Sequence, residues 1–250
     1  MPLDLRPPTL SVVTCATHDG ADLDRTIASV RQQDIELEHI IIGGPERIDS
    51  TVAHYSPGVG GGPYAAMNAG ARVASGDLIA FLGAGDTYCS AASARTLVEI
   101  GSRYAWGYGR LCIFNERGAI RTHKFEPFSR RLLSMGVSYV PHPASVMRVS
   151  LLKELGGFDE SHEVIADQDV FLRACRLHEP GVSRAVIAHF RSGGLSTRSS
   201  KEIAQDFEII RRNVDGTMGR STFFDRGVTL AVFAGRSSVR LGRRAIGRLG

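Results

Sequence analysis

The 250-residue sequence has no apolar run of about 18 residues, the length that a membrane-spanning helix needs. Its first residues lack a charged segment followed by an apolar one, so we expect no signal peptide. The four cysteines are isolated along the chain, without the Cys-x-x-Cys spacing of zinc sites, and no disulfide framework is predicted. These absences favour a cytoplasmic protein with reduced thiols.

The composition is that of an ordinary globular chain. Hydrophobic residues make up 43% and charged residues 22%, and the formal net charge is +4. A chain of this length can bury a large core, so we expect one main domain with some elaboration. Neither repeats nor low-complexity tracts occur in the sequence.

Apolar runs and helical patterns alternate in the first half of the chain. The expected strands are residues 10–15, 39–42 and 77–82, and the expected helices are 22–30 (with Asp22 as N-cap), 63–74 and 90–102. This β-α-β-α-β order predicts an α/β fold with a parallel, doubly wound sheet and helices on both faces.

The second half has a mixed pattern. Residues 105–114 and 119–123 flank Asn-Glu-Arg-Gly and predict a hairpin. The other expected elements are a strand over 144–149, a short helix capped by Ser150, a helix opening at Asp167, a strand over 182–190 and a helix over 200–213.

The stretch from Gly76 to Asp86 reads Gly-Asp-Leu-Ile-Ala-Phe-Leu-Gly-Ala-Gly-Asp. Its apolar centre predicts a buried strand, which ends in small residues and one carboxylate. Open α/β sheets bind ligands outside the carboxyl ends of their strands, and hard divalent cations take oxygen ligands. We therefore expect Asp86 to hold a cation against a diphosphate. The alternative is a turn residue without a ligand.

A glycine-rich loop, residues 57–62, precedes the helix that begins near Pro63. Such a loop can cradle a pyrophosphate at a helix N-terminus. However, its spacing is not Gly-x-Gly-x-x-Gly, and residues 51–56 form a poor strand. No acidic residue follows in the ribose-binding position, so the sequence disfavours a dinucleotide-binding domain.

Four motifs occur in a fixed order. They are Tyr-Ala-Ala-Met-Asn-Ala-Gly at 64–70, the strand and carboxylate at 76–86, Gly-Gly-Phe-Asp at 156–159 and Asp-Gln-Asp at 167–169. Over roughly residues 9–200, the chain thereby resembles the family 2 glycosyltransferases of the GT-A fold. Within them it is most similar to bacterial enzymes of colanic acid and mycobacterial phenolic glycolipid assembly.

The resemblance implies an inverting transfer from a nucleotide sugar, UDP- or dTDP-linked, assisted by Mg²⁺ or Mn²⁺. By this resemblance Asp86 contacts the metal, and the end of the first strand lines the nucleoside pocket. Asp167 is the implied general base; a simple N-cap is the alternative, and Asp169 is the competing carboxylate. The expected donor-side residues are Thr14, Ala16, Thr17, Gly43, Met67, Asn68, Gly85, Asp86 and Asp169.

The chain also departs from the family pattern on the donor side. The second strand ends in Gly43-Gly44-Pro45, where the family usually has an Asp that reads the nucleobase. Gly85 and Ala65 stand where the family usually has Asp, and the loop before the Met-Asn helix has Gly60-Gly61-Gly62 where the family usually has Asp-Lys-Gly or Asp-Gln-Gly. The alternative function is therefore a nucleotide-sugar-binding pseudoenzyme that partners an active transferase. A GT-A-like nucleotidyltransferase is disfavoured, because residues 14–20 lack a basic residue.

Two histidines are further candidates. His189 ends the last strand and is expected to complete a metal site or to contact a phosphate. A partly buried side chain packed on the sheet edge is the alternative. His142, between two prolines, is expected to line the acceptor cleft or to belong to a rigid loop.

The last residues differ in character from the rest. We divide the chain into a GT-A domain, residues 1–215, and a basic amphipathic segment, residues 216–250. Arginines interspersed with apolar residues suit an anionic membrane surface and a lipid-linked or glycolipid acceptor. A helix docked on the domain is the alternative. Nucleic-acid binding is disfavoured, because stacking aromatics are not interleaved with the basic residues.

Overall fold

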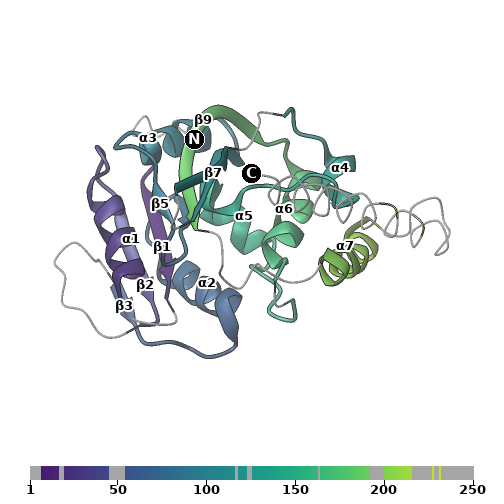
Figure 1. Ribbon diagram of the computed structural model, residues 1–250, viewed down its shortest axis with the longest axis horizontal. Helices are drawn as coiled ribbons and strands as arrows, with labels where there is room; N and C mark the ends of the chain where they lie inside the picture. Colours follow the sequence, from purple (N-terminus) through teal and green to yellow (C-terminus); the bar gives the residue numbers. More distant parts are fainter. Residues whose placement is uncertain are drawn as a thin grey trace, which may run out of the picture.

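The computed structural model describes residues 7–16, 20–44, 54–115, 118–122, 126–162, 164–191, 200–215, 227 and 231. Its first half builds the parallel part of the sheet (Figure 1). The elements are β1 (Leu10–Cys15), α1 (Ala21–Arg31), β2 (Glu38–Ile42), β3 (His54–Ser56), α2 (Gly62–Val73) and β4 (Leu78–Phe81). β1 lies between β2 and β4, and all three run parallel. Their carboxyl ends therefore meet at one edge.

The second half extends the same sheet. Its strands are β5 (Thr87–Tyr88), β6 (Trp106–Asn115), β7 (Gly118–Thr122), β8 (Ser145–Arg148) and β9 (Gly181–Arg191). Its helices are α3 (Ser93–Arg103), α4 (Arg130–Ser134), the 3₁₀ turn η1 (His142–Ala144), α5 (Val149–Glu154), α6 (Ala166–Leu177) and α7 (Ser200–Asp215). The strand order is β3-β2-β1-β4-β8-β6-β9-β5, with β7 paired to β6. β8 runs antiparallel to β4 and β6, whereas β6 and β9 are parallel.

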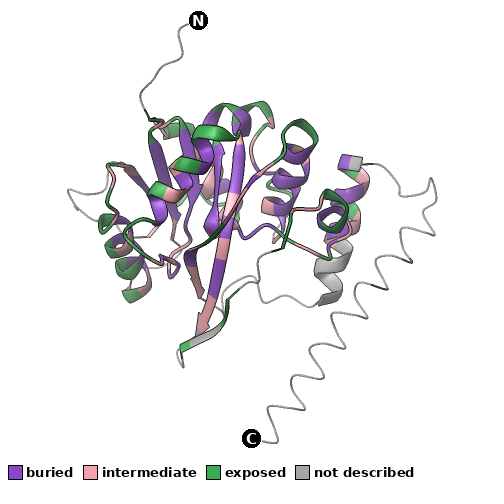
Figure 2. Ribbon diagram, turned by 90° about the horizontal axis from the view of Figure 1, so that it is seen from above, coloured by how far each residue is buried: buried purple, intermediate pink, exposed green. Residues whose placement is uncertain are grey.

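Alternation along the strands produces two cores, one on each face of the sheet. Val12 packs with residues of α1 and α3, and its neighbour Val13 packs with residues of α2, α5 and α6. Successive side chains of a strand point to opposite faces, so a strand that is apolar throughout belongs between two helical layers. Figure 2 shows the buried strands inside and the exposed surfaces of the helices outside.

The structure confirms several predicted elements. The strands of the first half, the 62–73 helix and the hairpin are present, and Asn115 pairs with Gly118 across its turn. All four cysteines are free. The 51–56 segment, a poor strand by its sequence, nevertheless contains β3, which pairs in parallel with β2.

The predicted caps Asp22 and Ser150 are wrong, and the N-cap alternative for Asp167 does not hold. Asp22 is the second residue of α1, whose N-cap is Gly20 with φ 142°. Asp167 likewise lies within the first turn of α6, whose N-cap is Ile165, and Ser150 lies inside α5, whose N-cap is Arg148. Since Asp167 does not cap its helix, its carboxylate is available for other contacts.

The proposed division after residue 215 involves a segment that, apart from Gly227 and Ala231, lies outside the described residues. The membrane-binding prediction for residues 216–250 therefore stays a prediction. Within the part of the chain that the structure describes, no helix combines the length and apolarity needed to cross a membrane.

Candidate functional site

The ends of β1, β2 and β4 come together with little side-chain material between them. The Ala16 N–H donates to the Ile42 carbonyl at 2.9 Å, and the Ala84 N–H donates to the Cys15 carbonyl at 3.2 Å. Gly43 has φ +87°, and a Cβ there would lie 2.1 Å from the Ala16 carbonyl oxygen. Only glycine fits this approach. Two predicted donor residues, Ala16 and Gly43, are thus neighbours; Thr17 lies outside the described residues.

Asp86 follows β4 in a loop that α1 and β9 hold in place. The Arg191 backbone N–H donates to Asp86 Oδ1 at 3.0 Å. Thr26 Oγ1 donates to the Asp86 carbonyl at 2.7 Å and lies 3.0 Å from the Gly85 nitrogen, whose N–H donates to it. Gly85 has φ +100°, a conformation that favours glycine. The loop therefore fixes the carboxylate through backbone contacts.

Burial dominates the electrostatics of Asp86, whose exposed fraction is 7%. Desolvation raises the pKa of its carboxyl to about 7, although hydrogen bonds from the Arg191 and Gly83 backbone act in the opposite direction. A bound cation would favour the ionised form, because a metal ligand must be deprotonated. Asp86 is thus a carboxylate whose charge a ligand can change near neutral pH.

The described residues support a metal site only through Asp86. His189 pairs with Thr87 across β9 and β5, and its ring lies against Phe114 at a centroid distance of 5.9 Å and an angle of 70°. In the described ranges, no group of three His, Cys, Asp or Glu side chains could hold a metal ion. Mg²⁺ is often bound by one or two carboxylates plus substrate phosphates, and one buried carboxylate at the strand edge fits that arrangement.

Asp22 and Arg191 lie over Gly85, and the sequence analysis did not identify them as site residues. A Cβ on Gly85 would lie 3.5 Å from Asp22 Cγ and 3.6 Å from Arg191 Cδ. The Arg191 guanidinium pairs with the Asp22 carboxylate, which also contacts Arg25. No local motif marks this pair, since its members are 169 residues apart. The pair places the positively charged Arg191 guanidinium beside the Asp86 loop.

Asp167 is held from both sides. Tyr64 Oη lies 3.2 Å from Asp167 Oδ1 and also donates to the Val164 carbonyl at 2.5 Å. Gln168 Nε2 donates to Asp167 Oδ2 at 3.0 Å. Burial and the nearby Asp167 charge raise the pKa of Tyr64, which therefore keeps its proton and acts as a donor. A half-buried carboxylate oriented in this way can accept a proton from a hydroxyl.

Tyr64 and Gln168 both stand inside motifs that the sequence analysis used, but neither was selected as a site residue. Tyr64 belongs to the 64–70 motif, and Gln168 stands between Asp167 and Asp169. Membership of these motifs was the signal that could have identified them. Their roles depend on contacts across the fold. Tyr64 is 103 residues from Asp167 in the sequence.

His142 is not among the residues that line the cavity described below. It is enclosed by the rings of Phe81, Phe158 and Phe171, at centroid distances of 5.4, 5.7 and 5.9 Å. Burial lowers the pKa of its imidazole, and the Asp167 charge opposes this effect. His142 is thus a half-buried side chain that packs against aromatic rings.

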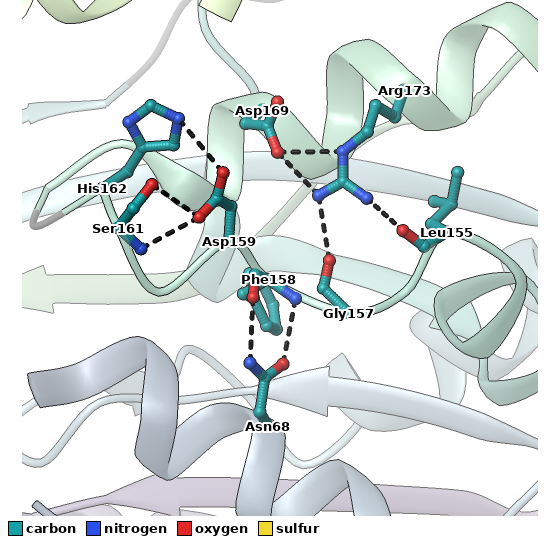
Figure 3. Close-up of polar contacts among 9 residues, drawn as sticks. All are labelled: Asn68, Leu155, Gly157, Phe158, Asp159, Ser161, His162, Asp169 and Arg173. Atoms are coloured by element: carbon teal, nitrogen blue, oxygen red, sulfur yellow. Dashed lines mark hydrogen bonds and ion pairs between the residues drawn. The ribbon is translucent and has the colours of Figure 1, made fainter. Parts of the chain in front are cut away.

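Asn68 joins α2 to the Gly-Gly-Phe-Asp turn (Figure 3). Its Nδ2 donates to the Phe158 carbonyl at 2.9 Å and to Glu160 Oε1 at 2.8 Å, and its Oδ1 accepts the Phe158 N–H at 2.9 Å. A Cβ on Gly157 would lie 2.6 Å from Asn68 Oδ1, so the turn needs glycine there. These contacts make Asn68 a bridge within the fold; its contact with a donor stays a prediction.

Asp169 has a different environment from Asp167. It is buried and accepts from Arg173 Nε at 2.9 Å and from Nη2 at 2.6 Å (Figure 3). Arg173 also donates to the carbonyls of Gly157 and Leu155. The pair therefore fixes the segment between α5 and α6, in agreement with a supporting role for Asp169.

Thr14 and Met67 both contact the core. Thr14 is fully buried, and its Oγ1 lies 2.9 Å from His39 Nε2. Met67 is half-buried and packs against the core on the α2 and α6 face. The structure thus places their side chains in the packing beneath the strand edge, and their predicted contact with a donor is not tested.

A cavity of about 650 Å³ lies on the side of the sheet that carries α4 and α6. It is bounded by β6, β7, the start of β9 and residues 126–141. Its apolar and aromatic lining includes Tyr108, Phe128, Leu132, Val137 and Tyr139. This volume is within the range of small-molecule sites.

The comparisons with known proteins agree with these observations. Two curated proteins from two strains of Mycobacterium tuberculosis, each named an uncharacterized glycosyltransferase, are 36% identical to this chain over 249 residues. Each comparison covers 92% of this chain and 91% of the relative. No protein-family model matches the sequence.

Solved structures show the same fold. The S. aureus TarS 1–349 complex with UDP-GlcNAc has a TM-score of 0.64 at 15% identity, over 83% of this chain and 67% of TarS. The mannosyltransferase of Pyrobaculum calidifontis in complex with GDP-Man and Mn²⁺ has a TM-score of 0.59 at 14% identity, over 100% of this chain and 84% of its own. The predicted α/β fold class is confirmed.

Proposed function

The chain belongs to the glycosyltransferases, and from this premise we propose that it transfers a sugar from a nucleotide-sugar donor to an acceptor hydroxyl with inversion. The observation that carries the proposal is the pair of carboxylates in different settings. Asp86 is buried at the strand edge, and Asp167 is oriented by Tyr64 and Gln168. We assign Asp86 to the leaving diphosphate and Asp167 to the attacking hydroxyl.

The donor is proposed to lie at the edge formed by β1, β2 and β4, which carries the small residues Ala16 and Gly43. TarS and the mannosyltransferase are solved with UDP-GlcNAc and with GDP-Man and Mn²⁺, which supports a nucleotide sugar and a divalent cation here. A UDP- or dTDP-sugar is our proposal. Asp86 would hold the cation, with His189 as a further candidate ligand, and the cation would neutralise charge on the departing diphosphate.

Asp167 is proposed as the general base. The acceptor oxygen attacks the anomeric carbon on the face opposite the nucleotide, while its proton passes to an Asp167 oxygen. The bond from the anomeric carbon to the diphosphate oxygen breaks, and the nucleoside diphosphate leaves with the electron pair. Proton transfer of this kind contributes ~10²–10⁴-fold to a rate. Tyr64 and Gln168 hold the carboxylate for this step.

The acceptor is proposed to be a glycolipid, a lipid-linked precursor or a polysaccharide precursor. The cavity wall combines apolar and aromatic residues with the charged residues Arg110, Arg121 and Glu126, which supports an acceptor with both an apolar and a polar portion. The basic segment 216–250 would associate with an anionic surface, which gives a cytoplasmic protein at the inner face of the cell membrane.

A nucleotide-sugar-binding pseudoenzyme is the second candidate. It is favoured by one observation: within the described ranges, Asp86 is not joined by two further ligand side chains. A panel of UDP-, dTDP- and GDP-sugars, each with Mg²⁺ or Mn²⁺, separates the candidates. A transferase should show a thermal shift and nucleotide release. A thermal shift without release supports the pseudoenzyme, and the absence of both rejects a nucleotide-sugar protein.

A further inference from the structure

Gln168 lies between the two carboxylates of the Asp-Gln-Asp motif and is buried. Its side-chain amide makes three hydrogen bonds. Oε1 accepts the Val140 N–H at 2.9 Å, and Nε2 donates to the Val140 carbonyl at 2.9 Å and to Asp167 Oδ2 at 3.0 Å. The side chain is thus hydrogen-bonded to the Val140 backbone and to the Asp167 carboxylate.

The Val140 contacts determine the orientation of this amide. An N–H group needs an acceptor, so the Gln168 oxygen must face the Val140 nitrogen. The Gln168 nitrogen then faces the Val140 carbonyl with one hydrogen, and its second hydrogen is left for Asp167. In the reversed orientation, Gln168 Nε2 would face the Val140 N–H, which is also a donor. Gln168 Oε1 would face the Val140 carbonyl, which is also an acceptor. The two hydrogen bonds to the Val140 backbone therefore direct the remaining Gln168 hydrogen toward Asp167.

Val140 itself belongs to the cavity wall, together with Tyr139 and Pro141. Gln168 consequently connects this wall to the carboxylate by one side chain. Tyr64 holds the other oxygen of Asp167 from α2. The carboxylate is thus restrained by two side chains, Tyr64 and Gln168. Of these two, Gln168 is the one that is hydrogen-bonded to a residue of the cavity wall.

We propose that Gln168 is a positioning residue, which sets the Asp167 carboxylate relative to the cavity wall so that an acceptor seated there presents its hydroxyl to Asp167. This inference rests on the proposed function of Asp167 as base. Gln168 does not touch the reacting atoms. Its effect is on the alignment of base and acceptor, and misplacement by about 1 Å can cost ~10²-fold in rate.

The test compares Gln168→Met with Gln33→Met in the full chain. Methionine keeps the length of the side chain and removes all hydrogen bonds. Gln33 is a matched control, because it also makes three bonds to backbone, to the Ser29 and Ser90 carbonyls and from the Ala94 N–H. The assay measures nucleotide release from UDP-GlcNAc and GDP-mannose with Mn²⁺, with octyl glucoside as the acceptor probe.

We expect Gln168→Met to lower kcat by ~10–100-fold with an unchanged donor KM. Gln33→Met should keep the kcat of the unaltered chain. Equal kcat values in the two variants would overturn the proposal. If Gln168→Met does not fold, Gln168→Glu serves instead; it retains an acceptor for Val140 and removes the donor to Asp167, and the same loss of kcat is expected.

Crystal structures of the variants provide a readout that does not depend on turnover. In the Gln168 variant, we expect the Asp167 carboxylate to rotate away from its present position or residues 139–141 to move relative to it. Unchanged positions of both would refute the positioning role. If the unaltered chain releases no nucleotide from any donor, the proposed function fails, while the structures still decide whether Gln168 positions Asp167.

Discussion

At the carboxyl edge of β1, β2 and β4, the chain surrounds Asp86 mainly with backbone and glycine, whereas the α6 side surrounds Asp167 with side-chain hydrogen bonds. Asp86 accepts from the Arg191 main chain, and Asp167 contacts the side chains of Tyr64 and Gln168. The position of Asp86 should therefore tolerate most changes at residue 191. The position of Asp167 depends on the identity of its neighbours.

The departures from the family pattern fall on the first of these regions. Gly43, Ala65 and Gly85 stand where the family usually has a carboxylate, while the Asp-Gln-Asp motif is intact. At Gly43 the structure gives a physical reason, because a Cβ would overlap the Ala16 carbonyl. The chain thus packs backbone closely around the strand edge that carries Asp86, whereas Asp167 is surrounded by side-chain contacts.

The largest expected effect tests the α6 region. Asp167→Asn should lower kcat by ~10²–10⁴-fold with little change in donor affinity, since it removes a group that acts in the transition state. Asp169→Asn should lower the thermal stability instead, because Arg173 loses a buried ionic partner. Steady-state kinetics and binding by calorimetry measure both. An inactive Asp169 variant beside an active Asp167 variant would reverse the assignment.

The second-largest effect is expected from a substitution at the strand edge. Asp86→Ala should abolish metal-dependent nucleotide binding, because the site then lacks the buried carboxylate. Titration of UDP or dTDP with and without Mn²⁺ measures this loss, and circular dichroism confirms that the fold persists. An affinity equal to that of the unaltered protein would reject Asp86 as the metal ligand.

The same carboxylate predicts a pH dependence of stability. The pKa of Asp86 is raised to about 7 by burial, so its proton is bound more tightly in the folded state than in the unfolded state. The ligand-free protein should therefore lose stability as the pH rises from about 4 to about 7 and then level off. Asp86→Asn should remove this contribution, of roughly 2–4 kcal/mol, above pH 7. Denaturant unfolding of both proteins at pH 5 and pH 8 measures it. A constant difference between them would contradict the prediction.

The sequence predicted the elements whose signal is local. Apolar runs identified β1, β2 and β4, and the turn residues identified the hairpin. Two short elements, β3 and η1, have no such pattern. The placement of β8 between β4 and β6 depends on pairing between distant segments, which the order of strands along the chain does not specify.

The site shows the same distinction. Asp86 and Asp167 stand in recognisable motifs, so they were found from sequence. Their partners were not found, because the contacts are set by the folded chain: Arg191 is 105 residues from Asp86, and Val140 is 28 residues from Gln168. Such contacts carry no periodic signal.

A further effect concerns the basic segment, which lies outside both regions. Truncation after Gly219 should leave the domain folded and weaken its binding to anionic vesicles. Each arginine near such a surface contributes about 1 kcal/mol, and salt reduces this contribution. Co-sedimentation with anionic and neutral vesicles at low and high salt measures it. Unfolding of the truncated chain would instead identify the segment as part of the domain, and equal binding would reject the membrane contact.

The smallest expected effect concerns Asn68, which joins α2 to the Gly-Gly-Phe-Asp turn. Asn68→Ala leaves the Phe158 N–H and carbonyl without their side-chain partner, and buried unpaired groups cost roughly 1–3 kcal/mol. Asn213→Ala is the matched control, because Asn213 is exposed on α7. Denaturant unfolding should show a loss for Asn68→Ala alone. Because Tyr64 lies one turn away on the same helix, the loss should be accompanied by a lower kcat. Equal stability of the two variants would mean that the Asn68 hydrogen bonds do not stabilise the contact between α2 and the Gly-Gly-Phe-Asp turn.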